Sequence, residues 1–199
     1  MKSQFRVGNS MDNLSRFEVP QQEITLDKIP GSGLIIDIGG GGEGLVSRIE
    51  GTRVCAIDIR MSEIREAMIH NPPANWFVCD GQRLCFKDCS FQIATLWFSL
   101  GYMSDWRIKE NVMKEVHRVL EKDGLVSIRA SKIDCDEERL IFRVIYTLPN
   151  GTLSQTGYGV KGNQNQTFST ISKMIVDSNF EIVKQVDSSH WFQITARKV

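Results

Sequence analysis

The chain of 199 residues is 41% hydrophobic and carries 24 basic and 24 acidic side chains, so it suits one ordinary domain with a sizeable core and has a formal net charge of zero. The balanced charge gives no general basic excess for a nucleic-acid partner, and no stretch reaches the roughly 20 apolar residues of a membrane-spanning helix. Because the first residues lack the apolar core of a secretory signal and the five cysteines are odd in number, we expect a cytoplasmic protein with reduced thiols.

The first 30 residues form a polar N-terminal segment, in which residues 14–30 predict a short helix broken at Pro20 and ended at Pro30. Beyond this segment, short branched apolar runs predict buried strands, and apolar residues at helical spacing predict helices. In chain order the strands are 33–39, 53–59, 75–80, 90–100 and 125–131, and the helices are 43–51, 61–70 and 106–124. This alternation predicts a parallel sheet with helices on both faces.

The pattern changes in the last third of the chain. Residues 139–160 predict two strands around Asn150-Gly151, a dipeptide typical of hairpin turns, and we expect this hairpin, at about 137–162, to be an insertion. A helix over 166–180 and a pair of strands over 181–199 complete the chain. The sequence thus predicts a doubly wound α/β fold with a mostly parallel sheet, a C-terminal antiparallel strand pair and an inserted hairpin.

The first predicted strand leads into a block of glycines with an acid beside it. Gly39, Gly41 and Gly44 satisfy the dinucleotide pattern Gly-x-Gly-x-x-Gly, and a strand, glycine turn and helix place backbone N–H groups toward a ligand. Asp37 stands two places before the first glycine, where its carboxylate would face the phosphates of a dinucleotide at an electrostatic cost. S-adenosylmethionine removes this conflict, because it carries a sulfonium and an ammonium and no phosphate.

Two further acids end the next two strands. Asp58 lies roughly 20 residues after the first glycine, where a carboxylate can accept both ribose hydroxyls of either NAD or S-adenosylmethionine. Asp80, followed by Gly81, can accept a hydrogen bond from an adenine amino group. Because the carboxyl ends of parallel strands meet at one edge of a sheet, the three acids would line one crevice. The alternatives are a helix cap at Asp37, a solvated strand end at Asp58 and a plain turn residue at Asp80.

The chain resembles class I S-adenosylmethionine-dependent methyltransferases in four consecutive motifs, namely LIIDIGGGGEG, VCAIDI, FVCDGQRLCFKDCSFQIATLWFSLGYM and VHRVLEKDGLVSIR. The closest similarity is to the small-molecule group that includes the ubiquinone/menaquinone-biosynthesis type. The resemblance covers about residues 33–130 and implies a Rossmann-like fold, with 1–199 as a single methyltransferase domain. The chain departs from the family at Glu43, where glycine is frequent, at Gln92, where aspartate is usual, and in the turn Lys122-Asp123-Gly124.

The resemblance also implies which residues bind S-adenosylmethionine. The contacts are Asp37, Gly39, Gly41 and Trp97 for the methionine part, Asp58 for the ribose, and Ile59, Asp80 and Gly81 for the adenine. Orientation of the acceptor and exclusion of water would be the main catalytic tasks, so a dedicated base is optional and no catalytic residue is predicted.

The small-molecule methyl acceptor is expected to meet aromatic side chains, although each of these has ordinary packing as its alternative. Tyr102 is the first candidate, and Trp106 would help to wall the site. The N-terminal segment and the hairpin would add further apolar walls through Phe5, Phe17, Tyr146 and Tyr158.

Two other functions are compatible with the sequence. An NAD-dependent oxidoreductase would use the glycines and Asp58, and a non-catalytic module would hold S-adenosylmethionine without transferring its methyl group. No metal is expected, because Cys79, Cys85 and Cys89 contain no Cys-x-x-Cys pair and have no histidine nearby.

Overall fold

A seven-stranded sheet forms the centre of the computed structural model, which describes residues 14–70 and 72–199. The strand order is β4-β3-β2-β5-β6-β10-β9, with β4 to β6 parallel and β10 antiparallel to both of its neighbours. The strands are β2 (Ile35–Ile38), β3 (Val54–Asp58), β4 (Asn75–Val78), β5 (Phe91–Trp97), β6 (Leu120–Ser131), β9 (Phe180–Asp187) and β10 (Trp191–Lys198). The predicted α/β class, the mostly parallel sheet and the C-terminal antiparallel pair are confirmed.

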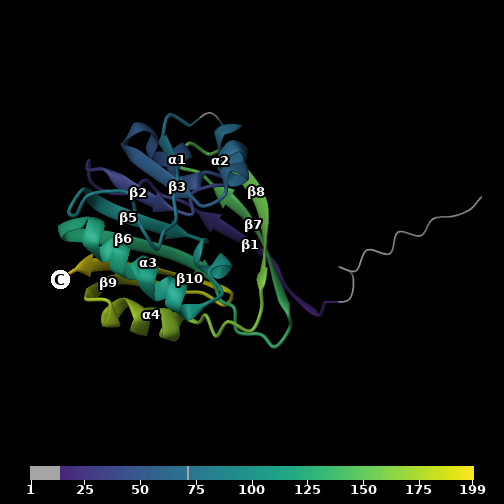
Figure 1. Ribbon diagram of the computed structural model, residues 1–199. Helices are drawn as coiled ribbons and strands as arrows, with labels where there is room; N and C mark the ends of the chain where they lie inside the picture. The colour runs from purple at the N-terminus through teal and green to yellow at the C-terminus, as the bar shows by residue number, and fades with distance from the viewer. Residues whose placement is uncertain (1–13, 71) are drawn as a thin grey trace, which may run out of the picture.

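Four α-helices connect these strands (Figure 1). They are α1 (Leu45–Glu50), α2 (Met61–Met68), α3 (Trp106–Val119) and α4 (Phe168–Asp177), with the short 3-10 helices η1 (Gly51–Arg53) and η2 (Leu100–Tyr102). The Asp105 side chain caps α3 by accepting from the Arg107 amide at 2.8 Å, and Thr167 and Thr170 form a capping box at α4. The helix expected to reach residue 124 ends at Val119, because β6 begins at Leu120.

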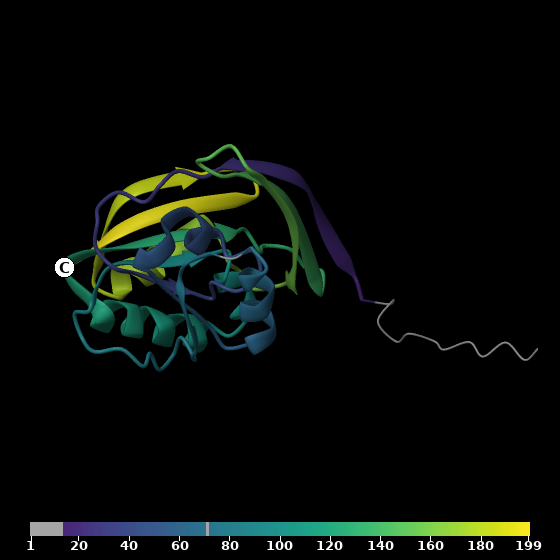
Figure 2. The same cartoon turned by 90° about the horizontal axis from the view of Figure 1, so that it is seen from above.

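A second sheet of three strands contains the hairpin and an unexpected partner. Its order is β1-β7-β8, with β1 at Arg16–Thr25, β7 at Arg139–Thr147 and β8 at Leu153–Lys161. The hairpin turn lies where Asn150-Gly151 predicts it, and Gly151 has a φ of +82°. Figures 1 and 2 show this sheet beside the main sheet, with β1 running along the hairpin.

The predicted helix near the N-terminus is wrong, because residues 16–25 form strand β1, parallel to β7. Val19 and Ile24 are buried, and Arg143 of β7 pairs with Glu18 of β1 at 2.9 Å. Pro20 lies in the break of register between residues 19 and 22, a position where a strand tolerates the missing N–H. Tertiary pairing with a strand more than 100 residues away thus decides the conformation.

The alternation of side chains along the strands divides the core between two faces. On one face, the sheet packs against α3 and α4 in a hydrophobic cluster that includes Ile36, Ile38, Val112, Val116, Ile171 and Ile175. On the other face, the sheet packs against α1 and the second sheet in a cluster that includes Ile35, Ile93, Trp97, Val19, Phe142 and Tyr146. Among residues 14–70 and 72–199, no helix combines the length and the apolar character needed to cross a membrane.

Candidate functional site

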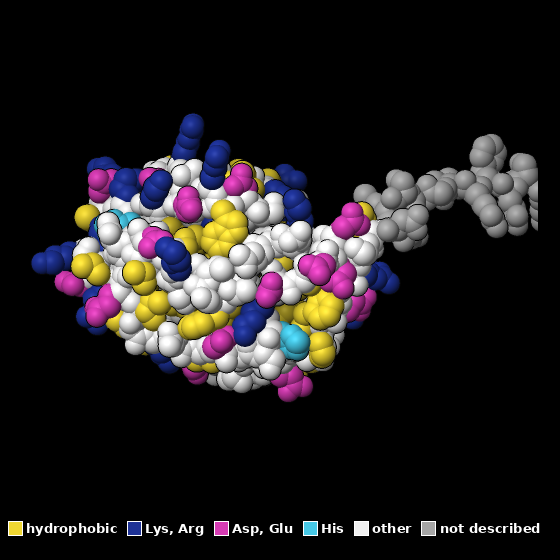
Figure 3. Space-filling view, turned by 90° about the horizontal axis from the view of Figure 1, so that it is seen from below, with side chains coloured by type: hydrophobic (Ala, Val, Ile, Leu, Met, Phe, Trp, Pro, Cys, Tyr) yellow, Lys and Arg dark blue, Asp and Glu magenta, His cyan; other side chains and the backbone are white. Residues whose placement is uncertain are grey.

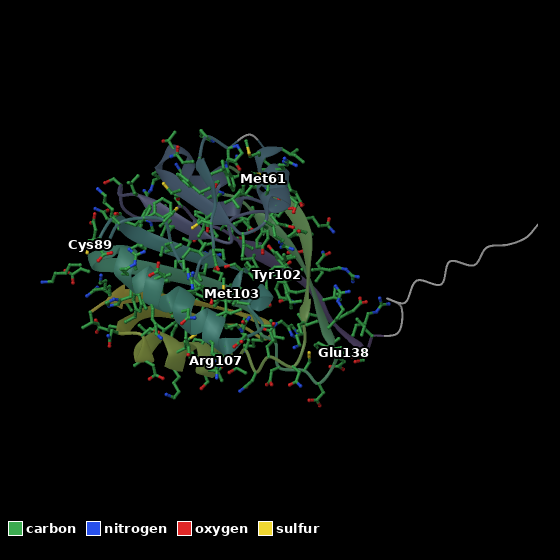
Figure 4. All side chains as sticks on the ribbon, viewed as in Figure 1. Met61, Cys89, Tyr102, Met103, Arg107 and Glu138 are labelled. Atoms are coloured by element: carbon green, nitrogen blue, oxygen red, sulfur yellow. The ribbon has the colours of Figure 1, made fainter. Side chains whose placement is uncertain are left out.

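A cavity of about 580 Å³ lies at the carboxyl ends of β2, β3, β4 and β5, the usual ligand position in an open α/β sheet. The residues predicted from the sequence that line it are Asp37, Gly39, Gly41, Asp58, Ile59, Asp80, Gly81, Trp97, Tyr102 and Tyr158. Figure 4 shows Tyr102 and Met103, which both line the cavity, on the side of the molecule between α2 and α3. The three carboxylates therefore share one crevice, as the strand-end argument predicts.

Asp37 is the most deeply buried acid of the site, at 2% exposure. Its Oδ1 accepts a hydrogen bond of 2.6 Å from Thr95 Oγ1 on the neighbouring strand β5. Burial raises the pKa of Asp37 to about 7, the Thr95 hydrogen bond opposes this shift, and the nearby charge of Asp58 adds to it. A cation placed against this carboxylate would offset the cost of its ionisation.

The glycine loop passes so close to these acids that side chains are excluded. A Cβ atom at Gly40 would lie 2.4 Å from Asp37 Oδ2, and one at Gly41 would lie 2.8 Å from Asp58 Oδ2. Gly39 has a φ of +71°, and a Cβ there would lie 2.5 Å from the Cβ of Ser99. The loop therefore presents bare backbone to the cavity.

Asp58 and Asp80 each accept one backbone amide two residues ahead. The Arg60 amide donates to Asp58 Oδ1 at 2.9 Å, and the Gln82 amide donates to Asp80 Oδ1 at 2.9 Å. Within the described residues, no donor contacts Asp58 Oδ2, so this oxygen is available to a ligand hydroxyl. Ile59 next to it is 64% exposed at the rim of the cavity.

Trp97 and Phe98 line the cavity at the end of β5, between the two sheets. The Trp97 indole N–H donates to Ser127 Oγ at 3.1 Å, and the Arg129 guanidinium lies 4.5 Å from the centre of its ring. Burial lowers the pKa of Arg129. Phe98 has a φ of +59°, a conformation that side chains rarely adopt, and it lines the cavity. Backbone strain of this kind concentrates at functional sites, and nothing in the sequence around Phe98 signals it.

Two further features of the site were missed from the sequence. Ser99 is buried beside the glycine loop and lines the cavity, and its hydroxyl lacks a hydrogen-bond partner in the described part of the chain. Glu43 of the loop accepts a hydrogen bond of 2.5 Å from Ser154 on β8, and Arg48 Nη1 lies 3.3 Å from the same carboxylate oxygen. The hairpin is thereby attached to the glycine loop, a contact between residues 111 positions apart that no local pattern reveals.

The residues predicted to contact the methyl acceptor lie in different parts of the structure. Tyr158 faces Phe98 with ring centres 5.4 Å apart and planes within 8° of parallel, and its hydroxyl lies 2.9 Å from that of Tyr146. Tyr102 is 49% exposed at the cavity mouth.

Trp106 does not line the cavity. Its indole N–H donates to the Gln164 carbonyl at 3.0 Å, so this side chain packs α3 against the segment before α4. Phe17 is 40% exposed on β1, and Phe5 lies outside the described residues.

A match to the family described as "Methyltransferase domain" covers residues 35–124, which include the glycine loop, all three acids and β5. Residues 35–124 are thus similar to a methyltransferase domain. S-adenosylmethionine is accordingly the cofactor expected of this methyltransferase domain, and the cationic ligand inferred from Asp37 agrees with it.

Solved structures of similar proteins share the fold of the methyltransferase domain. A methyltransferase from Methanosarcina mazei is 20% identical, with a TM-score of 0.63 over 86% of this chain and 94% of the other. One from Mesorhizobium loti is 16% identical, with a TM-score of 0.60 over 85% and 94%. The N-methyltransferase NodS from Bradyrhizobium japonicum is 12% identical, with a TM-score of 0.59 over 83% and 85%. No curated protein matches the chain, and the ubiquinone-like subtype is not confirmed.

Proposed function

We propose that this protein transfers the methyl group of S-adenosylmethionine to a small-molecule acceptor by in-line attack of the acceptor on the sulfonium methyl. The buried carboxylate of Asp37 beside a side-chain-free glycine loop carries this proposal. Such an acid penalises a phosphate ligand and favours an ammonium, so it argues against the NAD-dependent alternative.

The cofactor is proposed to extend from the glycine loop to the end of β4. The contacts are Asp37, Gly39, Gly41 and Trp97 for the methionine moiety, Asp58 for the ribose, and Ile59, Asp80 and Gly81 for the adenine. The site fits this group in two respects. The Ser99 hydroxyl faces the methionine end of the cavity without a partner in the described residues, and Asp58 Oδ2 is open to a ribose hydroxyl.

S-adenosylmethionine supplies a methyl group that is already activated as a leaving electrophile, so the protein has to bind, orient and exclude water. Orientation of two reactants in a near-attack geometry can supply effective molarities on the order of 10⁵–10⁸ M. Phe98 and Tyr158 form the wall on the side of the second sheet, and Tyr102 forms the mouth. We propose that these three rings position the acceptor opposite the glycine loop.

Substitution of Asp58 tests the cofactor site. We expect Asp58→Ala to weaken S-adenosylhomocysteine binding by about 1–3 kcal/mol in calorimetry, because a buried acceptor of the ribose is lost. Asp136→Ala changes an exposed acid outside the cavity and should leave the affinity unchanged. Unchanged affinity in Asp58→Ala would remove this residue from the ribose site.

Thermal-shift measurements separate the three functions considered from the sequence. Stabilisation by S-adenosylhomocysteine and none by NADH supports the methyltransferase, and the reverse pattern would replace it with the reductase. Tight cofactor binding without S-adenosylhomocysteine formation across broad acceptor panels would favour the non-catalytic module.

A further inference from the structure

We propose that the methyl acceptor is a small amine, which an aromatic and acidic chamber beside the cofactor site recognises through its positive charge. This inference rests on the proposed methyl transfer and deepens it, because it names the class of substrate.

The charge of the cavity is strongly one-sided. Among the described residues, six carboxylates line it against a single guanidinium, that of Arg60. The cofactor assignment uses Asp37, Asp58 and Asp80 and leaves three glutamates. Glu43 pairs with Arg48 and Glu63 pairs with Arg60, whereas Glu66 has no ion-pair partner among the described residues. S-adenosylmethionine carries two positive groups and one carboxylate, so a cavity loaded with it remains acidic. An acidic, partly dry chamber attracts cations and repels anions.

The excess acids flank the two tyrosines of the acceptor end. Burial is the main cause of the raised pKa of Tyr102. The nearby charge of Arg60 opposes this shift, and the charges of Glu63 and Glu66 on α2 add to it. Glu43 lies near Tyr158 and acts in the same direction on that hydroxyl, again after burial. Carboxylates thus lie near both rings. Because Glu66 is the one among them without an arginine partner in the described residues, a cation is the ligand that fits this end of the cavity.

The basic groups near this chamber already have partners. Arg60 Nη2 lies 3.4 Å from Glu63 Oε1, and its guanidinium lies 5.7 Å from the centre of the Tyr102 ring. Arg48 approaches Glu43 from outside the cavity lining and bonds to Ser154. A carboxylate or phosphate acceptor would have to displace one of these ion pairs, whereas an ammonium would add to the acids.

Aromatic faces give the cation a second source of attraction. Phe98 and Tyr158 are stacked, and Tyr102 meets Tyr158 edge-on with ring centres 6.5 Å apart. A cation over an aromatic ring gains about 0.5–1 kcal/mol at an exposed site and about 2 when it is desolvated. Rings and carboxylates together select an organic ammonium over a neutral molecule of the same shape.

The charge recognised at binding is also the charge that forms during transfer. The neutral amine is the reacting species, because an ammonium has no free electron pair and first loses a proton to solvent. The nitrogen pair then forms the C–N bond while the C–S pair stays on sulfur, so the positive charge passes from sulfur to nitrogen. The new ammonium releases its proton to water unless nitrogen is fully substituted. Carboxylates and ring faces that stabilise this cation therefore lower the barrier.

Calorimetry on protein saturated with S-adenosylhomocysteine tests the proposal with benzylamine, benzyl alcohol and benzoate at neutral pH. These three probes have nearly the same shape and carry a positive, zero and negative charge. We expect benzylamine to bind about 10-fold more tightly than either of the others, corresponding to about 1.4 kcal/mol. Equal or tighter binding of the alcohol or the acid would overturn the amine assignment, as would the absence of benzylamine binding.

Matched variants locate the effect in the chamber. Glu66→Gln should weaken benzylamine several-fold and leave the affinities for benzyl alcohol and S-adenosylhomocysteine unchanged. Glu110→Gln changes an exposed acid of α3 outside the cavity and should change none of them. Loss of benzylamine selectivity in Glu110→Gln, or its full retention in Glu66→Gln, would refute the proposal that the cavity acids recognise the amine. A failure of wild-type protein to bind S-adenosylhomocysteine would instead refute the proposed function.

Discussion

Thr95 Oγ1 donates a 2.6 Å hydrogen bond to Asp37 Oδ1 across the neighbouring strands β5 and β2. The bond favours the carboxylate, yet burial outweighs it and keeps the pKa of Asp37 at about 7. The protein without ligand therefore carries an acid that ionises at a cost near neutral pH. A ligand cation relieves that cost, which connects the register of two strands to the choice of cofactor.

Asp37→Asn should stabilise the unliganded protein at alkaline pH. The pKa of Asp37 is about 7 in the folded state and 3.8 for an aspartate free in water, so the unfolded chain binds fewer protons between these limits. Native stability therefore falls as pH rises through this window. Asparagine keeps an oxygen for Thr95 without the charge, and the gain reaches up to roughly 4 kcal/mol above pH 7. Urea unfolding at about pH 4.5 and pH 8 measures it, and equal stability at pH 8 would contradict the assignment.

Cofactor affinity should follow the ionisation of Asp37. A bound ammonium favours the carboxylate, so binding below about pH 7 releases up to one proton, and affinity rises with pH until it levels off near that value. Calorimetry of S-adenosylhomocysteine in buffers of different ionisation enthalpy measures the released proton. Asp37→Asn should bind weakly and release none. Proton release that persists in this variant would assign the linkage to another group.

Gly40→Ala should impair both the loop and the cofactor site. The new Cβ would lie 2.4 Å from Asp37 Oδ2 and 3.3 Å from the Cβ of Ala56, and the short Asp37 side chain is buried and held by Thr95. We expect at least about a 10-fold loss of S-adenosylhomocysteine affinity, equivalent to about 1.4 kcal/mol, and a lower melting temperature. Gly157→Ala is the control for the melting temperature only, since its Cβ meets nothing nearer than 3.8 Å but Gly157 lines the same cavity. Wild-type affinity in Gly40→Ala would show that the loop can move away.

Gln164→Leu should destabilise the fold through a buried polar network. The Gln164 amide donates to the carbonyls of Gly101 and Lys161, and its oxygen accepts from the fully buried Lys109 Nζ at 3.0 Å. Loss of these partners should cost about 2–4 kcal/mol in urea unfolding.

The same network should be sensitive to pH. Burial lowers the pKa of Lys109 to about 8, so its charged form, which most needs the oxygen of Gln164, disappears as pH rises through that value. The difference between Gln164→Leu and wild type should therefore shrink at about pH 9. Gln185→Leu, an exposed change on β9, is the control. If the loss of unfolding free energy in Gln164→Leu does not depend on pH, the charge of Lys109 does not contribute to it.

The central sheet could be predicted because its information is local. Branched apolar runs, strand-end acids and helical spacing recur within windows of a few residues, and a parallel sheet requires such runs to alternate with helices. For the same reason the glycine loop and the three acids could be placed at one sheet edge. Their detailed cofactor contacts stay predictions.

The features missed from the sequence depend on distant contacts. Residues 16–25 read as a broken helix, and only their pairing with β7 makes them a strand. Trp106 stands near the candidate residues in sequence, yet its indole N–H is taken by Gln164. Phe98 has a positive φ although phenylalanine has no intrinsic preference for it, and its ring packs against Phe142 and Tyr158 of the second sheet.

The parallel pairing of β1 with β7 has a consequence for protein engineering. A truncated form starting at residue 33 would keep every proposed cofactor contact, but it would leave the amides and carbonyls of β7 bare along one side. Such an edge recruits strands from other molecules. We therefore expect β1 to protect the edge of β7 against aggregation. A design that transfers the β7–β8 hairpin to another protein should include β1 as well.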